Sequence, residues 1–133
     1  MKGRLISFVL GIAISVMTAD AHHSIAGAYD SKQRVTIEGI IAQFQFVNPH
    51  PFVTMDVTQA GSTQHWRIEM DNRSELAQVG MTGETLKHGD RIVVTGNPAY
   101  SQAQSLYVIR LDRPSDGFRY EQVGSSPRIS VPK

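Results

Sequence analysis

The chain has 133 residues, with 13 lysines and arginines, 12 aspartates and glutamates, and a net charge of +1 when the histidines are neutral. This balance argues against a general nucleic-acid-binding protein, because such proteins need a basic excess to displace the counterions of phosphates. The lack of cysteine in the sequence excludes disulfide bonds, thiolate metal sites, iron–sulfur clusters and cysteine nucleophiles. Any metal ion would therefore be bound by histidine, carboxylate, methionine or backbone groups.

The first 21 residues have the three parts of a secretory signal peptide. Residues 2–4 carry two positive charges, residues 5–17 are apolar, and residues 19–21 form a small-x-small cleavage site. The apolar run is shorter than the roughly 20 residues that a membrane-spanning helix needs. We therefore expect cleavage after Ala21, export to the periplasm or beyond, a mature chain that begins at His22, and no membrane association of that mature chain.

The first half of the mature chain predicts an arm and three strands. Residues 22–33 are expected to form an extended arm or loop. Residues 34–47 alternate imperfectly around Gly39, which predicts a long strand bent by a glycine bulge. Residues 52–58 and 64–70 alternate strictly about a turn and predict a hairpin. Its apolar face should contain the side chains of Val53, Met55, Val57, Trp66, Ile68 and Met70.

The second half predicts one short helix and two strands. A short helix is predicted over residues 73–79, because Asn72 or Ser74 can cap its start and Gly80 follows its end. Strands are expected over residues 91–96 and 105–112. The proline-containing tail, residues 113–133, is expected to be loosely ordered.

The order of these elements predicts the fold. Three strands, a short helix and two more strands, with the first strand long and bent, are what a five-stranded OB-like Greek-key barrel requires. The barrel domain should span residues 34–112. Another small barrel or a β-sandwich is the alternative.

Five short motifs of the chain point to a known family. They are His22-His23-Ser24, Val35-Thr36-Ile37-Glu38-Gly39, Asn48-Pro49-His50, Trp66-Arg67-Ile68-Glu69-Met70 and Leu86-Lys87-His88-Gly89-Asp90. With these motifs the chain resembles an uncharacterised family of small secreted bacterial proteins, DUF6152. The resemblance covers residues 22–112 and departs from the family at Phe46 and Met81, where tryptophan is expected. It implies secretion and a β-rich fold, and it implies no activity.

The mature N-terminus suggests a metal site. A terminal His22 would offer its α-amine and its imidazole as a chelate, and His23 or His50 would add a further nitrogen. Such nitrogen donors favour copper(II) among divalent ions. Glu69 and Asp71 are expected at the same end of the barrel as His50, where they would accept a ring N–H from a ligand histidine. Alternatively, the two histidines are only a polar start to the arm, and Asn48-Pro49-His50-Pro51 only stiffens a loop.

Catalytic motifs are missing from the sequence. It contains no G-x-S-x-G nucleophile elbow, no P-loop and no dinucleotide fingerprint. We therefore interpret the protein as a binding or accessory module rather than an enzyme. Two hypotheses remain: a periplasmic protein that binds copper or another divalent metal, and an OB module that binds an organic or polymeric ligand or a protein partner.

Overall fold

The computed structural model describes residues 21–132, with side chains from Ile25 onward. The predicted signal peptide therefore lies outside the described residues, apart from the backbone of Ala21. The elements in chain order are α1 (Ala21–Ala28), β1 (Val35–Gln45), β2 (Phe52–Gln59), β3 (Ser62–Glu69), α2 (Arg73–Gln78), β4 (Arg91–Pro98), β5 (Ser105–Arg113), β6 (Phe118–Val123) and β7 (Ser126–Ser130).

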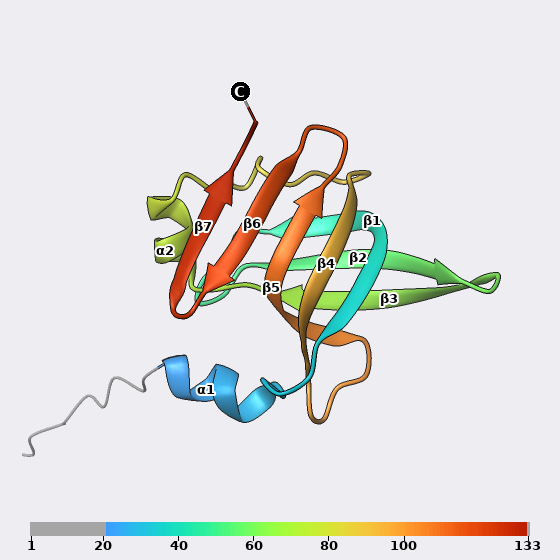
Figure 1. Cartoon of the computed structure of the whole chain (residues 1–133), viewed down its shortest axis with the longest axis horizontal. Coiled ribbons are helices and arrows are strands. Elements are labelled where there is room, and N and C mark those ends of the chain that lie inside the picture. The colour runs from blue at the N-terminus through green and yellow to red at the C-terminus, as the bar shows by residue number, and fades with distance from the viewer. Residues whose placement is uncertain (1–20, 133) are drawn as a thin grey trace, which may run out of the picture.

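Strands β1 to β5 form a closed barrel (Figure 1). Antiparallel pairs join β1 to β2, β2 to β3, β1 to β4 and β4 to β5. The barrel closes through a short parallel pairing of β3 with β5. This strand order, with α2 between β3 and β4, is that of an OB-fold barrel, so the predicted fold class is confirmed.

Strand β1 serves both sides of the barrel because it bends midway. Its first half pairs with β4 and its second half with β2, with Ile40 common to both pairings. The predicted bulge at Gly39 is wrong, since the register slips at Ala42, between Ile41 and Gln43. Gly39 is instead a point of close approach, where a β-carbon would lie 2.2 Å from the carbonyl oxygen of Asp56. Because glycine has no side chain, the β2 backbone can approach β1 closely at the point where β1 changes its pairing from β4 to β2.

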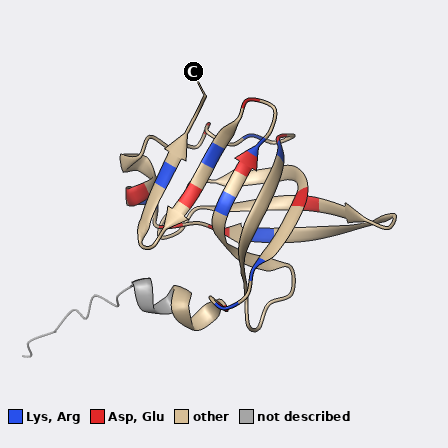
Figure 2. Cartoon of the chain, in the orientation of Figure 1, with Lys and Arg blue, Asp and Glu red and all other residues tan. Residues whose placement is uncertain are grey.

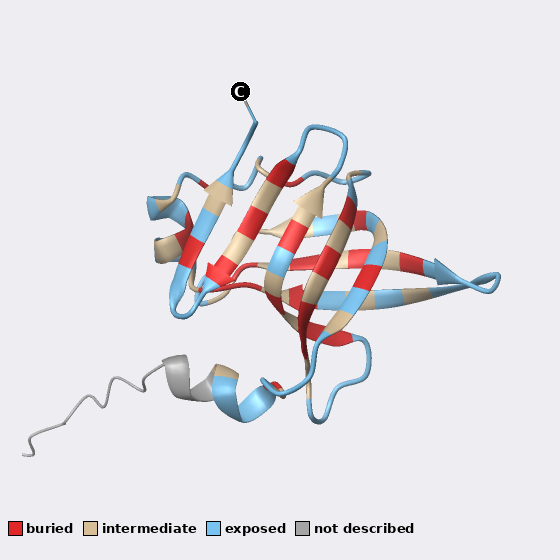
Figure 3. Ribbon diagram, viewed as in Figure 1, coloured by how far each residue is buried: buried red, intermediate tan, exposed pale blue. Residues whose placement is uncertain are grey.

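The barrel interior contains the apolar face predicted for the hairpin. The side chains of Val53, Met55, Val57, Ile68 and Met70 are buried, and Trp66 is partly buried against them. Buried positions also recur along β4, β5 and β6 (Figure 3). The predicted helix is present as α2, where the Asn72 side chain accepts a hydrogen bond from the Glu75 N–H at 2.9 Å.

The C-terminal segment differs from the prediction. Residues 113–133 were expected to be loosely ordered, but β6 and β7 form a hairpin that extends the sheet from β5. Alternation in residues 118–123 turns Phe118 and Tyr120 into the core, where both are fully or almost fully buried. Apolar burial therefore outweighs the loop-like composition of this segment.

The N-terminal arm also differs, because residues 21–28 form α1 instead of an extended arm. Its C-terminal end is fixed to the barrel: the Asp30 N–H donates to Pro98 O at 2.8 Å, and the Tyr100 N–H donates to Ala28 O at 3.0 Å. Tyr29 is buried at this junction. The helix thus lies at the barrel end where the β6–β7 turn also lies (Figure 1).

Opposite charges face one another across the outer surface of β5, β6 and β7 (Figure 2). Arg110 is the register partner of Glu121, and Asp112 is that of Arg119. The Asp112 carboxylate also accepts hydrogen bonds from Arg110 at 2.6 Å and from Arg119 at 2.7 Å. Burial alone would raise the pKa of Asp112, but these two arginines lower it below its usual value. The charges stabilise this sheet face and leave it nearly neutral.

Candidate functional site

The loop that contains His50 is joined to the segment after β3. The Met70 N–H donates to Pro51 O at 2.9 Å, and the Arg73 N–H donates to Pro49 O at 3.1 Å. The Asn48–Pro49 peptide bond is cis. The two hydrogen bonds place His50 next to Asp71, as expected from the antiparallel pairing of β2 with β3.

The two ring nitrogens of His50 have different environments. Nδ1 lies 2.9 Å from Met70 O, and because a carbonyl oxygen only accepts, Nδ1 donates its proton. The neutral ring then has a free lone pair on Nε2. Nε2 is buried and has no hydrogen-bond partner among the described residues. A buried imidazole nitrogen of this kind is suited to bind a metal ion or a ligand proton donor.

Asp71 is a buried carboxylate, with 4% of its surface exposed. One oxygen accepts the Asn72 N–H at 2.7 Å, and the other accepts the Gln122 side-chain amide at 2.6 Å. The Tyr120 hydroxyl donates to the other end of that amide, Oε1 of Gln122, at 2.5 Å. Tyr120 and Gln122 of β6 therefore orient Asp71 through a continuous hydrogen-bonded chain.

His50 and Asp71 line the same pocket, which has a volume of about 420 Å³. Further walls come from α1 (Ile25 and Ala26), from β4 and β5 (Asn97, Tyr107 and Ile109), and from β6 and the turn after it (Gln122, Gly124 and Ser125). Helix α1 thus forms one wall of the pocket. The pocket lies at the end of the barrel, and its lining includes residues close to both ends of the described chain.

Burial and nearby carboxylates raise the pKa values of two tyrosines at this end of the barrel. Burial, followed by the charge of Asp71, raises the pKa of Tyr107 above its usual value. Burial also raises the pKa of Tyr29 to about 12, assisted by its hydrogen bond to Glu69. That bond, from the Tyr29 hydroxyl to Oε2 of Glu69, is 2.5 Å long.

The predicted site residues are distributed as follows. His50, Glu69 and Asp71 lie at one end of the barrel, as expected, whereas the side chains of His22 and His23 lie outside the described part. The ring N–H of His50 is accepted by the Met70 carbonyl, not by Glu69 or Asp71, which interact with Tyr29 and Gln122 instead. Among the side chains that the structure describes, no three histidine or acidic groups cluster as a metal site.

The other histidines have separate environments. His65 is exposed on the β2–β3 hairpin, 2.6 Å from the Asp56 carboxylate, and lines no part of the pocket. His88 lies in the turn before β4, where its Nδ1 donates to Ala42 O at 2.9 Å. His88 therefore fixes the β1 bulge, which the sequence did not reveal.

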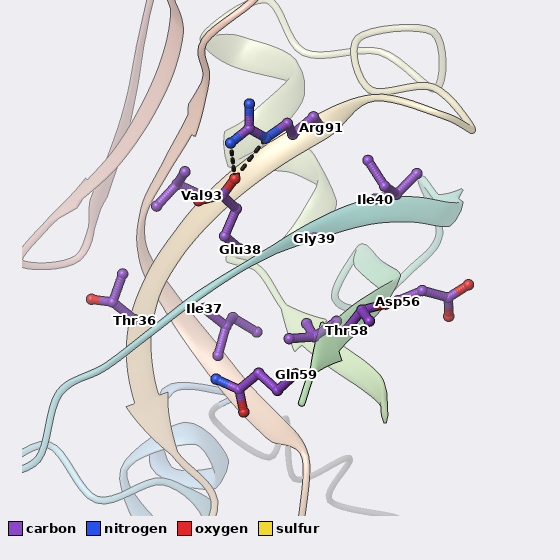
Figure 4. Close-up of a pocket in the computed structure, with 11 residues that line it drawn as sticks. Thr36, Ile37, Glu38, Gly39, Ile40, Asp56, Thr58, Gln59, Arg91 and Val93 are labelled. Atoms are coloured by element: carbon purple, nitrogen blue, oxygen red, sulfur yellow. Dashed lines mark hydrogen bonds and ion pairs between the residues drawn. The ribbon is translucent and has the colours of Figure 1, made fainter. Parts of the chain in front are cut away.

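A second depression, about 570 Å³ in volume, lies where β1 separates from β2 (Figure 4). Its wall includes Gly39 and an ion pair between Glu38 and Arg91 (Figure 4). Both charges are solvent-exposed and already paired. This groove therefore lacks the buried, unpartnered nitrogen that distinguishes the His50 pocket.

Gln122, Tyr120 and Asn97 were not predicted as site residues. Gln122 and Tyr120 belong to the segment expected to be loosely ordered, although the alternation in FRYEQV indicates a strand. Asn97 is buried and donates to Gln33 O at 2.7 Å, which fixes the segment after α1. No pattern in the sequence marks that contact.

The closed barrel and the pocket at its end define this chain as an OB-fold protein with a candidate binding site. The sequence matches the family of unknown function DUF6152 over residues 11–106, and the chain belongs to that family. The predicted family resemblance is thereby confirmed.

Two further comparisons concern solved structures and curated proteins. A crystal structure of the mitochondrial single-stranded DNA binding protein Rim1 of S. cerevisiae matches this chain at 12% sequence identity and a TM-score of 0.39, covering 74% of this chain and 83% of that one. No curated protein matches the sequence. Within residues 21–132, no helix has the length and apolar character needed to cross a membrane.

Proposed function

We propose that the mature protein is an exported accessory protein that binds a divalent metal ion, with copper(II) preferred, in the pocket beside His50. The observation that supports this most strongly is Nε2 of His50, which is buried and has no hydrogen-bond partner among the described residues, and whose residue lines the pocket. The hydrogen bond from Nδ1 to Met70 O fixes the tautomer that leaves Nε2 able to coordinate. A neutral imidazole held in this way is a common ligand for copper and zinc.

The mature N-terminus is the proposed source of the other nitrogen ligands. Helix α1 begins at Ala21, and its residues Ile25 and Ala26 line the pocket with His50. After cleavage behind Ala21, His22 would supply its amine and imidazole, and His23 a further nitrogen.

The test compares copper(II) binding by proteins with different N-termini. We expect the protein that begins at His22 to bind tightly and a protein with one added residue before His22 to bind at least about tenfold more weakly. His50→Gln should weaken binding as well. His65→Ala is the matched control, because His65 is an exposed histidine outside the pocket. Equal affinities of the native and extended proteins would refute the N-terminal site.

A small organic ligand is the second candidate, and Nε2 of His50, which has no hydrogen-bond partner among the described residues, supports it as well. The pocket beside His50 has a volume of about 420 Å³, which is large enough for such a ligand. In that case Nε2 of His50 would accept a hydrogen bond from the ligand. Weak copper binding, together with stabilisation of the protein by an organic compound and loss of that effect in His50→Gln, would favour this function.

A further inference from the structure

Asp71 is a buried carboxylate that has no positively charged partner among residues 25–132. None of the ion pairs within residues 25–132 includes it, and its two hydrogen-bond partners, a backbone N–H and the Gln122 amide, are neutral. Arg34 also lines the pocket but is exposed, whereas Asp71 is 4% exposed. Burying an ionised carboxylate in this way costs free energy that neutral hydrogen bonds offset only in part.

The same carboxylate keeps the capacity to bind something else. Two ionised oxygens offer about four acceptor positions, and the described contacts use one on each oxygen. Asp71 shares the pocket with the unpartnered Nε2 of His50. His50, whose Nε2 has no hydrogen-bond partner among the described residues, and the buried carboxylate of Asp71 therefore belong to residues that line a common pocket.

We propose that Asp71 binds the metal ion directly through a carboxylate oxygen, and that Gln122 is the positioning residue for Asp71. This inference rests on the proposed function, since it concerns the ion held by His50. The cation supplies the missing counter-charge, and the ligand set becomes nitrogen donors with one carboxylate, which suits copper(II) and nickel(II). Asp71 is thus a ligand, a different role from accepting the ring N–H of a histidine.

The positioning role follows from the direction of the hydrogen bonds. Because the Tyr120 hydroxyl donates to Oε1 of Gln122, the amide nitrogen is presented to Asp71. The same nitrogen also donates to Gly124 O at 3.2 Å, which fixes the Gln122 side chain to the turn after β6. The C-terminal hairpin therefore determines the orientation of the proposed ligand.

The test measures copper(II) affinity and the visible absorption of bound copper in the protein that begins at His22. Asp71→Asn keeps the size of the side chain and removes its charge, and we expect at least a tenfold loss of affinity and a shifted absorption band. Gln122→Leu should lower affinity by about tenfold and leave the band in place, because the ligand atoms are unchanged. Asp56→Asn is the matched control, since Asp56 is an exposed carboxylate beside His65.

Stability with and without metal separates a ligand from a structural carboxylate. Both oxygens of Asp71 accept from N–H donors, so the amide group of an asparagine would face one donor, and the melting temperature of metal-free Asp71→Asn should fall. A metal ligand also predicts a smaller rise of the melting temperature on adding copper(II) to Asp71→Asn, whereas a purely structural carboxylate leaves that rise unchanged. If Asp71→Asn does not fold, Gln122→Leu carries the test, and unchanged affinity there overturns the proposal.

The outcomes distinguish this inference from the proposed function. Unchanged affinity in Asp71→Asn, with loss of binding in His50→Gln, overturns the role of Asp71 and leaves the His50 site standing. No copper(II) binding by the wild-type protein that begins at His22 overturns both.

Discussion

Replacing Gly39 by alanine tests how β1 serves both sides of the barrel. The new β-carbon would lie 2.2 Å from Asp56 O and 2.9 Å from the terminal methyl of Met55, whereas ordinary contacts begin at 3.4 Å. The methionine methyl can move, but the carbonyl oxygen belongs to a strand paired on both sides at this position. The strands must therefore separate by roughly 1 Å or distort, and overpacking of this kind costs about 3 kcal/mol.

The assay is urea unfolding of the wild type, Gly39→Ala and Gly27→Ala. Gly27 is the matched control, because it lies in α1 and a β-carbon there meets nothing within 4 Å. Alanine at position 27 should change the free energy of unfolding little, or raise it by up to about 1 kcal/mol through its higher helix propensity. A Gly39→Ala protein within about 0.5 kcal/mol of the wild type would refute the close approach of the strands.

Three further predictions concern the hairpin, the pH dependence and the turn before β4. Tyr120→Ala should lower the free energy of unfolding by about 3–5 kcal/mol, as for other large buried rings, and a loss below about 1 kcal/mol would show that the hairpin is not part of the core. Burial, with the hydrogen bond to Glu69, raises the pKa of Tyr29 from 10 to about 12. Between pH 10 and about pH 12 the native state keeps a proton that the unfolded chain releases, so the free energy of unfolding falls as the pH rises through this range. Tyr29→Phe should reduce that fall, as measured by urea unfolding at a series of pH values. Arg113→Gln should lower the free energy of unfolding, measured by heat or urea, by about 2 kcal/mol. The reason is that Arg113 donates to Asp90 at 2.7 Å and its side chain is only 14% exposed. An unchanged free energy of unfolding would contradict a stabilising role of this ion pair.

The barrel could be predicted because its elements have strong local signals. The residues of the β2–β3 hairpin alternate without interruption, and parity alone identified Val53, Met55 and Ile68 as buried. The start of α2 likewise had a local signal, since Asn72, one of the two possible caps in the sequence, is its N-cap. The bulge was misplaced because a glycine in a strand indicates either a bulge or a close backbone approach, and Gly39 is the second case.

The terminal elements could not be predicted, because their structure depends on contacts with distant residues. Helix α1 ends where Tyr29 packs against Tyr107 at a ring-centre distance of 5.8 Å and donates to Glu69, contacts that no local pattern contains. The prolines and glycines around β6 and β7 are typical of loops, yet Phe118 is buried by the barrel. The residues of the site likewise divide into predictable and unpredictable ones. Strand pairing placed His50 and Asp71 together, whereas Gln122 lies 51 residues after Asp71 in the chain.

The bond between Gln122 and Asp71 sets the order in which the pocket can form. A chain that is synthesised or exported from its N-terminus presents α1 and His50 well before β6 exists outside the ribosome or the membrane. Until β6 and β7 dock, the carboxylate of Asp71 remains hydrated and its orientation is free. The pocket is therefore complete only when the last two strands are docked, and fraying of these strands would open it without breaking the pairing of β3 with β5 that closes the barrel.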